Sequence, residues 1–332
     1  MIKRYCRGGL LTTGFVVSLL ASAETPNPMT DGGLVYDEGD TAACIKRAVE
    51  SASDETTVGQ LRRRCNQRLQ QSTDIEKRYL KELSIRDNRF AITAHRPNYI
   101  LLAAHDTSGI NTTGLDPDTG KNTETRFQVS MKFPVIENLL GKQGWDIYAG
   151  YTNRSFWQLY DQENSAPFRE TNHEPEIWLS MNTDWRYRGF RNRALRLGFS
   201  HQSNGRSGDL SRSWNRLFGE FIFEKGRYSG SLKTWWRFPE DAATDDNPDI
   251  TDYMGHFEFL NVFTHKKHSL SVLLRNNLRS DMRGAVQVDW NFPLIEHFDG
   301  YVQWFNGYGE SLIDYNHRSN SFGIGVSLTD WL

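Results

Sequence analysis

Long hydrophobic runs are missing from this sequence after its first two dozen residues. A helix needs roughly 20 consecutive apolar residues to cross a bilayer, so no later segment can cross as a helix. The mean hydropathy of −0.63 is also too polar for a helical membrane protein. A membrane β-barrel is still possible, because its polar lumen-facing residues alternate with lipid-facing ones.

Strong net charge is absent as well, since 39 Lys and Arg against 41 Asp and Glu give a formal charge of −2. A nearly neutral chain offers no electrostatic reason to expect a nucleic-acid partner. Aromatic residues, in contrast, make up 13% of the 332 residues. That share suits a barrel with girdles of aromatic side chains at the two membrane interfaces.

The N-terminus has the features of a secretory signal peptide. Lys3, Arg4 and Arg7 form a basic region, residues 10–20 an apolar core, and residues 21–23 a small-residue cleavage site. A membrane anchor is the alternative, but the apolar run is short for one. We therefore expect export and removal of residues 1–23.

Cysteine is scarce, and only Cys44 and Cys65 remain once Cys6 leaves with the signal peptide. Two thiols in one small segment of an exported protein predict a disulfide. Metal binding without nearby histidines, or two unpaired thiols, are the alternatives.

Residues 24–90 are expected to form a small periplasmic segment. Residues 24 to about 40 have the Pro, Gly and Asp content of a linker, and about 41 to 83 have the pattern of two or three short helices. This segment shows no catalytic grouping.

Residues 91–332 change to short alternating segments separated by Gly, Asn, Asp and Pro turns. About twelve strands are expected, at 99–105, 126–133, 145–152, 176–185, 194–202, 214–223, 230–236, 253–263, 269–275, 285–291, 300–304 and 322–328. An even strand number is typical of single-chain outer-membrane barrels. The expected fold is therefore all-β, a transmembrane antiparallel up-and-down β-barrel. A soluble β-sandwich would show the same alternation, but not the signal peptide together with the aromatic strand ends.

The candidate catalytic residues of the sequence lie at 201–216. His201 and Ser203 are two residues apart on one expected strand and so share a face with Leu197 and Phe199. Asn215 continues an apolar row on the next strand. In a soluble sandwich these polar groups would need buried partners, whereas in a membrane barrel they would face lipid.

The residue types suit ester hydrolysis. A serine hydroxyl becomes a good nucleophile when a histidine takes its proton, and a third group must orient the histidine. The Asn215 amide could do this without placing a charge beside lipid. Gly205 allows a tight turn whose N–H groups could face an oxyanion. His-x-Ser alone is a weak pattern, and its combination with export, a barrel and Asn215 carries the prediction.

Three further segments stand out. Asn153 follows a row of apolar residues that are expected to face lipid. Placing an amide there costs free energy unless it forms hydrogen bonds, which suggests that Asn153 contacts a second subunit. Residues 165–172 look like a loop near a strand end. Residues 244–249 form an acidic turn, usually only solvated but able to bind a hard cation.

The motif at 201–207, His-Gln-Ser-Asn-Gly-Arg-Ser, followed by Ser-Arg-Ser-Trp-Asn-Arg at 211–216, closely resembles the active-site signature of the outer-membrane phospholipase A family of Gram-negative bacteria. Residues 165–172, 245–250 and 307–316 also match this family. The resemblance implies a twelve-stranded outer-membrane barrel that dimerises with Ca²⁺ and hydrolyses acyl esters of phospholipids, with phospholipase A1, A2 and lysophospholipase activity.

The resemblance also implies residue roles. Ser203 would be the nucleophile, His201 the base and Asn215 the residue that orients the base. Calcium would be held by the Arg206 carbonyl, Ser211 and Ser165 of the partner subunit, with Asp246 a candidate for a second calcium site in the monomer.

The chain departs from the family pattern at a few places. Gly208 stands where the family commonly has Asp, and the acid follows as Asp209. Asn153 is shorter than the Gln that the family has in its dimer interface. Trp331 lies one place before the usual terminal aromatic residue.

A passive outer-membrane pore or structural barrel is the rival interpretation, and it would have an open polar lumen and no role for the outward Ser, His and Asn. A third possibility keeps the enzyme but gives it another acylated lipid or ester as substrate.

Overall fold

The computed structural model describes residues 44–45, 48–49, 52–69, 73–84, 92–113, 115, 120–166, 168–241, 243–295 and 298–331. The signal peptide and the linker predicted before residue 41 lie outside these ranges. Within them, no helix combines the length and the apolar character needed to cross a membrane.

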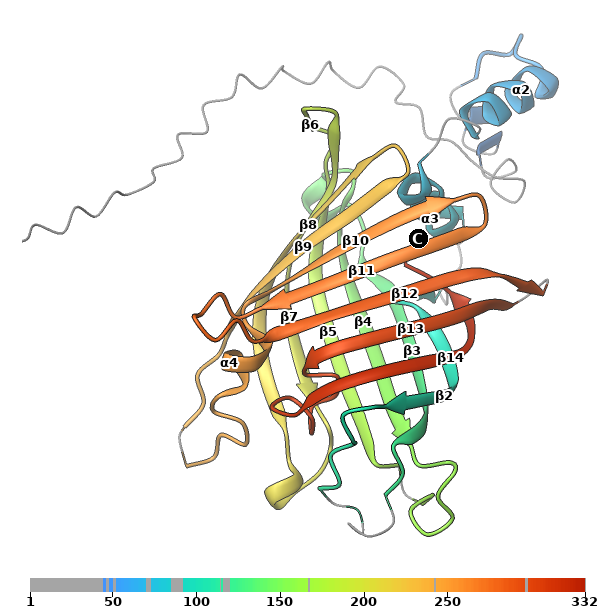
Figure 1. Ribbon diagram of the computed structural model, residues 1–332. Coiled ribbons are helices and arrows are strands. Elements are labelled where there is room, and N and C mark those ends of the chain that lie inside the picture. Colours follow the sequence, from blue (N-terminus) through green and yellow to red (C-terminus); the bar gives the residue numbers. More distant parts are fainter. Residues whose placement is uncertain are drawn as a thin grey trace, which may run out of the picture. The chain divides into compact units, whose positions relative to one another are not determined.

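Twelve long strands close into one antiparallel barrel (Figure 1). They are β2 (Asn98–Asp106), β3 (Thr123–Ile136), β4 (Trp145–Trp157), β5 (Glu170–Asn182), β7 (Phe190–Ser203), β8 (Ser213–Lys225), β9 (Tyr228–Arg237), β10 (Phe257–His265), β11 (His268–Asn276), β12 (Gly284–Ile295), β13 (Phe298–Tyr308) and β14 (Arg318–Thr329). Neighbours in the chain pair with each other, and β14 pairs with β2 to close the ring. Because the barrel is closed, no strand is left with an edge of unpaired backbone N–H and C=O groups, which would have no water to bond in lipid. The closed barrel confirms the predicted transmembrane fold.

Short elements complete the description. Strand β1 (Thr93–Ala94) pairs with β3, and β6 (Arg186–Tyr187) pairs with β7. Helices α2 (Val58–Leu69) and α3 (Asp74–Ser84) precede the barrel, and α4 (Ile250–Met254) lies in a loop. Single 3₁₀ turns occupy Leu139–Gly141 and Gly208–Leu210.

Two strand predictions need correction. The strand predicted at 253–263 starts at Phe257, because Ile250 and Met254 are buried on helix α4, which ends at Gly255 with a positive φ of 68°. The strand predicted at 176–185 runs over Glu170–Asn182, so three of the eight residues of the loop predicted at 165–172 are strand. The first outward residues of β5, Thr171 and His173, are polar, so the start of this strand lacks the usual alternation of apolar and polar residues.

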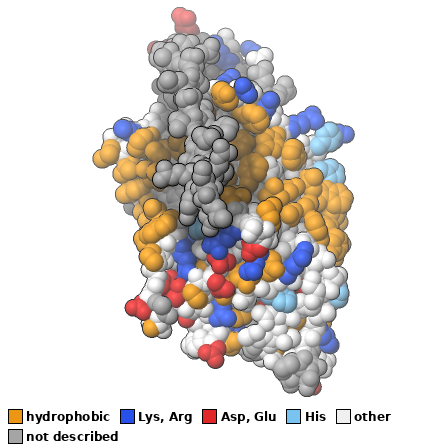
Figure 2. All heavy atoms as spheres, turned by 60° about the vertical axis from the view of Figure 1, so that its left-hand side comes forward, with side chains coloured by type: hydrophobic (Ala, Val, Ile, Leu, Met, Phe, Trp, Pro, Cys, Tyr) orange, Lys and Arg blue, Asp and Glu red, His pale blue; other side chains and the backbone are white. Residues whose placement is uncertain are grey.

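Side chains alternate across the barrel wall as the sequence predicts. On β14, Ile324 and Leu328 are 53% and 65% exposed, while Ser321 and Ser327 are buried. Figure 2 shows one face, where hydrophobic side chains gather in a band and most charged side chains lie above or below it. Such a band is what a membrane-spanning barrel presents to lipid.

The two barrel ends differ in their connections. At one end, β8–β9 and β10–β11 are joined by two residues each. At the other end, long loops occupy 107–122, 158–169, 204–212 and 238–256. Outer-membrane barrels have short periplasmic turns and longer extracellular loops. Ser203 ends β7 and Ser213 begins β8, so both lie at the long-loop end.

Helix α3 is bonded to the barrel at the short-turn end. Arg78 donates to the carbonyls of Ala94 (2.7 Å) and His95 (2.9 Å), and Glu82 pairs with Lys132 on β3 (2.9 Å). These contacts hold α3 independently of the part of the segment that precedes it.

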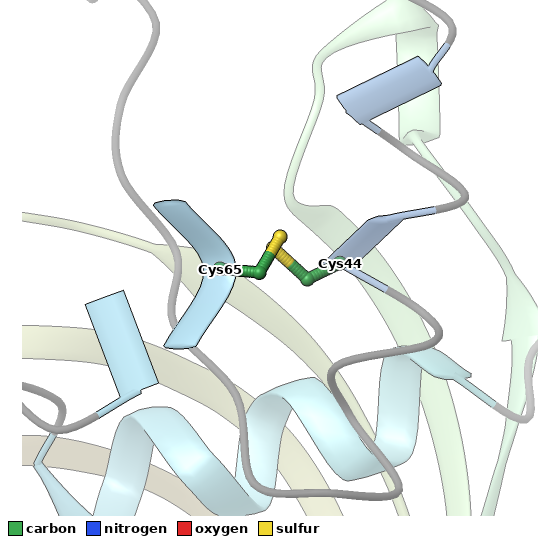
Figure 3. Close-up of a disulfide and its surroundings, with 2 residues drawn as sticks. All are labelled: Cys44 and Cys65. Atoms are coloured by element: carbon green, nitrogen blue, oxygen red, sulfur yellow. A yellow bond between two sulfur atoms is a disulfide. The ribbon is translucent and has the colours of Figure 1, made fainter. Parts of the chain in front are cut away.

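The structure contains the disulfide predicted between Cys44 and Cys65, whose Cα atoms are 6.0 Å apart (Figure 3). The two cysteines are 21 positions apart in the sequence, and both side chains are buried. The bond therefore closes a loop that includes most of α2.

Reduction of this disulfide is expected to make the region before α3 protease-sensitive while the barrel and its activity persist. A bridge over about twenty residues stabilises its segment by roughly 3 kcal/mol, mainly by restricting the unfolded chain. Limited proteolysis with and without reductant, read by mass spectrometry, checks this. Two free thiols in protein purified without reductant would contradict it.

Candidate active site

Strands β7 and β8 place His201, Ser203 and Asn215 on one face of the barrel wall. His201 pairs in register with Asn215, and Ser203 pairs with Ser213. Neighbours on the same face, such as Leu197 and Leu217, are 57% and 53% exposed, whereas the opposite face carries buried residues such as Ser200 and Phe218. The predicted outward row is therefore present.

Asn215 accepts a hydrogen bond from the His201 ring. The distance from Nδ1 of His201 to Oδ1 of Asn215 is 2.9 Å. An amide oxygen only accepts, so this contact places the proton of neutral imidazole on Nδ1. Nε2 is then left with a free lone pair, which is the form that a general base needs.

Ser203 lies two residues from His201 on β7 and is partly exposed. Among the described residues its hydroxyl has no hydrogen-bond partner, His201 included. Catalytic hydrogen bonds are often loose without substrate and tighten in the Michaelis complex. The Ser203 hydroxyl is therefore on the same face as the His201 ring and free of other hydrogen bonds among the described residues.

A polar network supports the site from the lumen side. Trp214 Nε1 donates to Gln202 Oε1 at 2.8 Å, and Arg216 Nη2 donates to Glu174 Oε1 at 2.6 Å. Trp214 and Arg216 are buried on either side of Asn215 in sequence. These contacts fix the backbone that carries the outward residues.

The loop after Ser203 is held by Asn204, to which the sequence alone assigned no role. Its buried amide donates to the Leu210 carbonyl at 2.8 Å and accepts from the backbone N–H of Arg212 at 3.0 Å and Arg206 at 3.3 Å. The sequence does contain a signal for this role, because an Asn at the start of a Gly-containing turn often hydrogen-bonds to the backbone of that turn.

Gly205 adopts a left-handed φ of 65° in this loop and is exposed. Within the described part of the chain its N–H has no hydrogen-bond partner. A free, outward N–H two residues after Ser203 can meet an oxyanion formed on a bound ester.

Two of the predicted calcium ligands come together across different loops. The Ser211 hydroxyl donates to Oδ2 of Asp246 at 2.5 Å. Arg206 lies in the loop of Ser211 and donates to the Phe168 carbonyl at 3.0 Å. Ser165 is not joined to this group, since its hydroxyl contacts the Gln162 carbonyl at 3.4 Å. The Gly208 departure is accommodated, because a 3₁₀ turn there leads directly to Ser211.

Glu240 adds negative charge beside these loops. Burial raises the pKa of its carboxyl, and repulsion from Asp245 and Asp246 raises it further. Its Oε1 is buried without a hydrogen-bond partner in the described part of the chain. No described group of three or more His, Cys, Asp or Glu side chains could hold a metal. The donors are instead hydroxyl, carbonyl and carboxylate oxygens, which fit a hard cation.

Asn153 lies on the outward face of β4, as predicted. Its Oδ1 accepts from Ser155 at 3.1 Å, and its Nδ2 lies 3.4 Å from Nδ1 of His173. The amide is thus paired within the chain, which removes part of the reason for expecting a subunit contact. That contact stays a prediction.

Aromatic side chains surround the site on its β9 side. Phe238 packs edge-on against Phe199 and Trp236, with ring centroids 5.8 and 4.8 Å apart. Trp236 is 54% exposed. His201, Ser203 and Asn215 therefore lie beside an exposed apolar surface.

Known proteins resemble the chain over most of its length. Residues 75–328, which include His201, Ser203 and Asn215, match the family described as Phospholipase A1. Phospholipase A1 of Salmonella typhimurium is 37% identical over 248 residues, covering 74% of this chain and 83% of that protein. The Escherichia coli K12 protein of the same name gives the same identity and coverage.

Solved structures share the architecture. The Salmonella typhi outer membrane phospholipase dimer with bound calcium matches with a TM-score of 0.69 and 35% identity, covering 74% of this chain and 95% of that chain. Outer membrane phospholipase A from Escherichia coli matches with a TM-score of 0.69 and 36% identity, covering 73% and 100%.

Proposed function

The chain belongs to the phospholipase A1 family, and we propose that it hydrolyses acyl esters of outer-membrane phospholipids with Ser203 as nucleophile. Phospholipid hydrolysis is the activity that this membership supports. The observation that carries the residue assignment is the 2.9 Å bond between His201 and Asn215 on the lipid-facing wall beside Ser203. Hydrolysis at the sn-1 and sn-2 positions and of lysophospholipids is part of the proposal.

The proposed reaction follows from the positions of these groups. Nε2 of His201 takes the Ser203 proton as Oγ attacks the ester carbonyl, and Asn215 orients the resulting imidazolium. The Gly205 N–H donates to the oxyanion. His201 then protonates the departing lysophospholipid alkoxide. Water, deprotonated by the same histidine, releases the fatty acid and restores Ser203.

The placement of the site suits a lipid substrate. Ser203 is at the long-loop end, which corresponds to the extracellular side of outer-membrane barrels. Leu197, Phe199 and Leu217 on the same face would contact acyl chains. A phospholipid could therefore reach the serine from the membrane without entering the barrel.

We extend the proposal to calcium and to a homodimer. The Arg206 carbonyl and Ser211 would hold Ca²⁺ together with the partner subunit's Ser165, and Asp246 would add a carboxylate or a second site. The 2.5 Å contact of Ser211 with Asp246 supports this donor set. When bound, the cation supplies positive charge near the developing oxyanion. Asn153 would lie in the subunit contact.

Removal of calcium is expected to lower phospholipid hydrolysis by about tenfold or more and to shift cross-linking from dimer to monomer. The reason is that the proposed ligands come from two subunits. Purified protein in detergent is assayed for fatty-acid release with Ca²⁺, with chelator, and with Ca²⁺ restored. Undiminished turnover in chelator would refute the calcium proposal, and no hydrolysis in any condition would refute the enzyme.

The lumen argues against the passive-pore alternative. Buried ion pairs cross it, including Lys233 with Glu176 at 2.7 Å and Arg169 with Asp314 at 3.1 Å. A cavity of about 110 Å³ lies among such charged side chains. An interior filled by paired charges does not provide the open polar lumen that a passive pore would have. The outward Ser203, His201 and Asn215 are therefore the better candidates for function.

A further inference from the structure

His173 is a second histidine beside Ser203 that the proposed reaction does not use. It lies on β5 and pairs in register with Ser203 on one side and with Asn153 on the other. Side chains in register on neighbouring strands have Cβ atoms about 4.5–5.5 Å apart and share a face. His173 and Ser203 therefore lie next to each other on the outward wall.

One edge of the His173 ring is fixed by partners on β4. Nδ1 lies 2.6 Å from the Tyr151 hydroxyl and 3.4 Å from Nδ2 of Asn153. The Asn153 amide turns its Oδ1 toward the Ser155 hydroxyl, from which it accepts at 3.1 Å, and presents its Nδ2 to the ring. Since Nδ2 can only donate, Nδ1 must accept, and the proton of neutral His173 is on Nε2.

The other edge of the ring faces the loop after the nucleophile. A Cβ built on Gly205 would lie 3.8 Å from Cδ2 and 3.9 Å from Nε2 of His173. Because Gly205 has no side chain, this space stays open. The Nε2–H of His173 and the unpaired N–H of Gly205 border the same space beside Ser203.

We propose that His173 is a catalytic residue that donates a second hydrogen bond, from Nε2–H, to the oxyanion of the reacting ester. The inference rests on the proposed function and deepens it. One N–H from Gly205 is joined by a side-chain donor that Tyr151 and Asn153 hold in the correct tautomer. Oxyanion sites use pairs of preorganised donors because charge that develops there is stabilised without reorganisation.

The test compares His173→Phe, which removes the donor, with His173→Gln, which keeps an N–H donor. His268→Phe is the matched control, an exposed histidine at the short-turn end of β11. Each variant is assayed on a p-nitrophenyl acyl ester, which has no phosphate, and on phosphatidylcholine. Heat-modified migration in gels verifies that each barrel is folded, and cross-linking reports the dimer.

His173→Phe is expected to lower kcat about a hundredfold on both substrates with little change in KM, as for loss of one oxyanion donor. His173→Gln should lose less, and His268→Phe should match the unmodified protein. A loss confined to phosphatidylcholine would overturn the proposal in favour of a phosphate-binding role. A loss that follows the loss of cross-linked dimer would overturn it in favour of a subunit contact.

Unchanged kcat in a folded His173→Phe variant would overturn this inference and leave the proposed function standing. An unmodified protein that hydrolyses neither substrate would overturn both.

Discussion

Replacing Ser203 by alanine is expected to abolish ester hydrolysis, with a loss of about 10⁴-fold or more, as for removal of other serine nucleophiles. Without Oγ no acyl-enzyme can form, and what remains comes from binding and the oxyanion donors. The variant should fold normally, because the Ser203 hydroxyl has no hydrogen-bond partner among the described residues. Fatty-acid release from phospholipid by purified protein measures the effect.

Ser213→Ala provides the matched control for this variant. Ser213 is the register partner of Ser203 on β8 and is similarly part-exposed. It should retain most of the activity. Full activity in Ser203→Ala would end the serine-hydrolase interpretation, and the passive barrel would become the leading one.

His201→Ala is expected to remove almost all activity, while Asn215→Ala should leave a measurable residue. The first change removes the group that takes the Ser203 proton during attack, a step that is worth about 10²–10⁴-fold. The second removes one neutral 2.9 Å hydrogen bond that orients the ring, a loss of about tenfold to a hundredfold.

Kinetics of both variants on one substrate, with gel migration as the folding control, separate these roles. Equal losses would show that Asn215 does more than orient the base. An Asn215→Ala variant with unchanged turnover would remove it from the site altogether.

The barrel could be predicted because its signal repeats along the chain. The alternation of apolar and polar residues on strands such as β14 indicates which residues face lipid. The same alternation predicts that His201 and Ser203 share one face of β7. The pattern failed where the outward residues at the start of β5, Thr171 and His173, are polar, and where buried Ile250 belongs to a helix.

The contacts between loops could not be predicted. Nothing local in the sequence brings Ser211 to Asp246, because the two residues come from different loops and meet only after the barrel closes. The same holds for His173, which pairs with Ser203 across strands 30 residues apart in the chain. Strand periodicity gives the face of a residue, whereas the neighbours on that face depend on register.

The most direct test of the account is the site of covalent labelling by a sulfonyl fluoride. The purified protein is treated with the reagent, assayed for phospholipid hydrolysis over time, and digested for tandem mass spectrometry. The account predicts an adduct on Ser203 that accumulates in proportion to the loss of activity. Complete inactivation with Ser203 unmodified, or full labelling of Ser203 with activity retained, would contradict it.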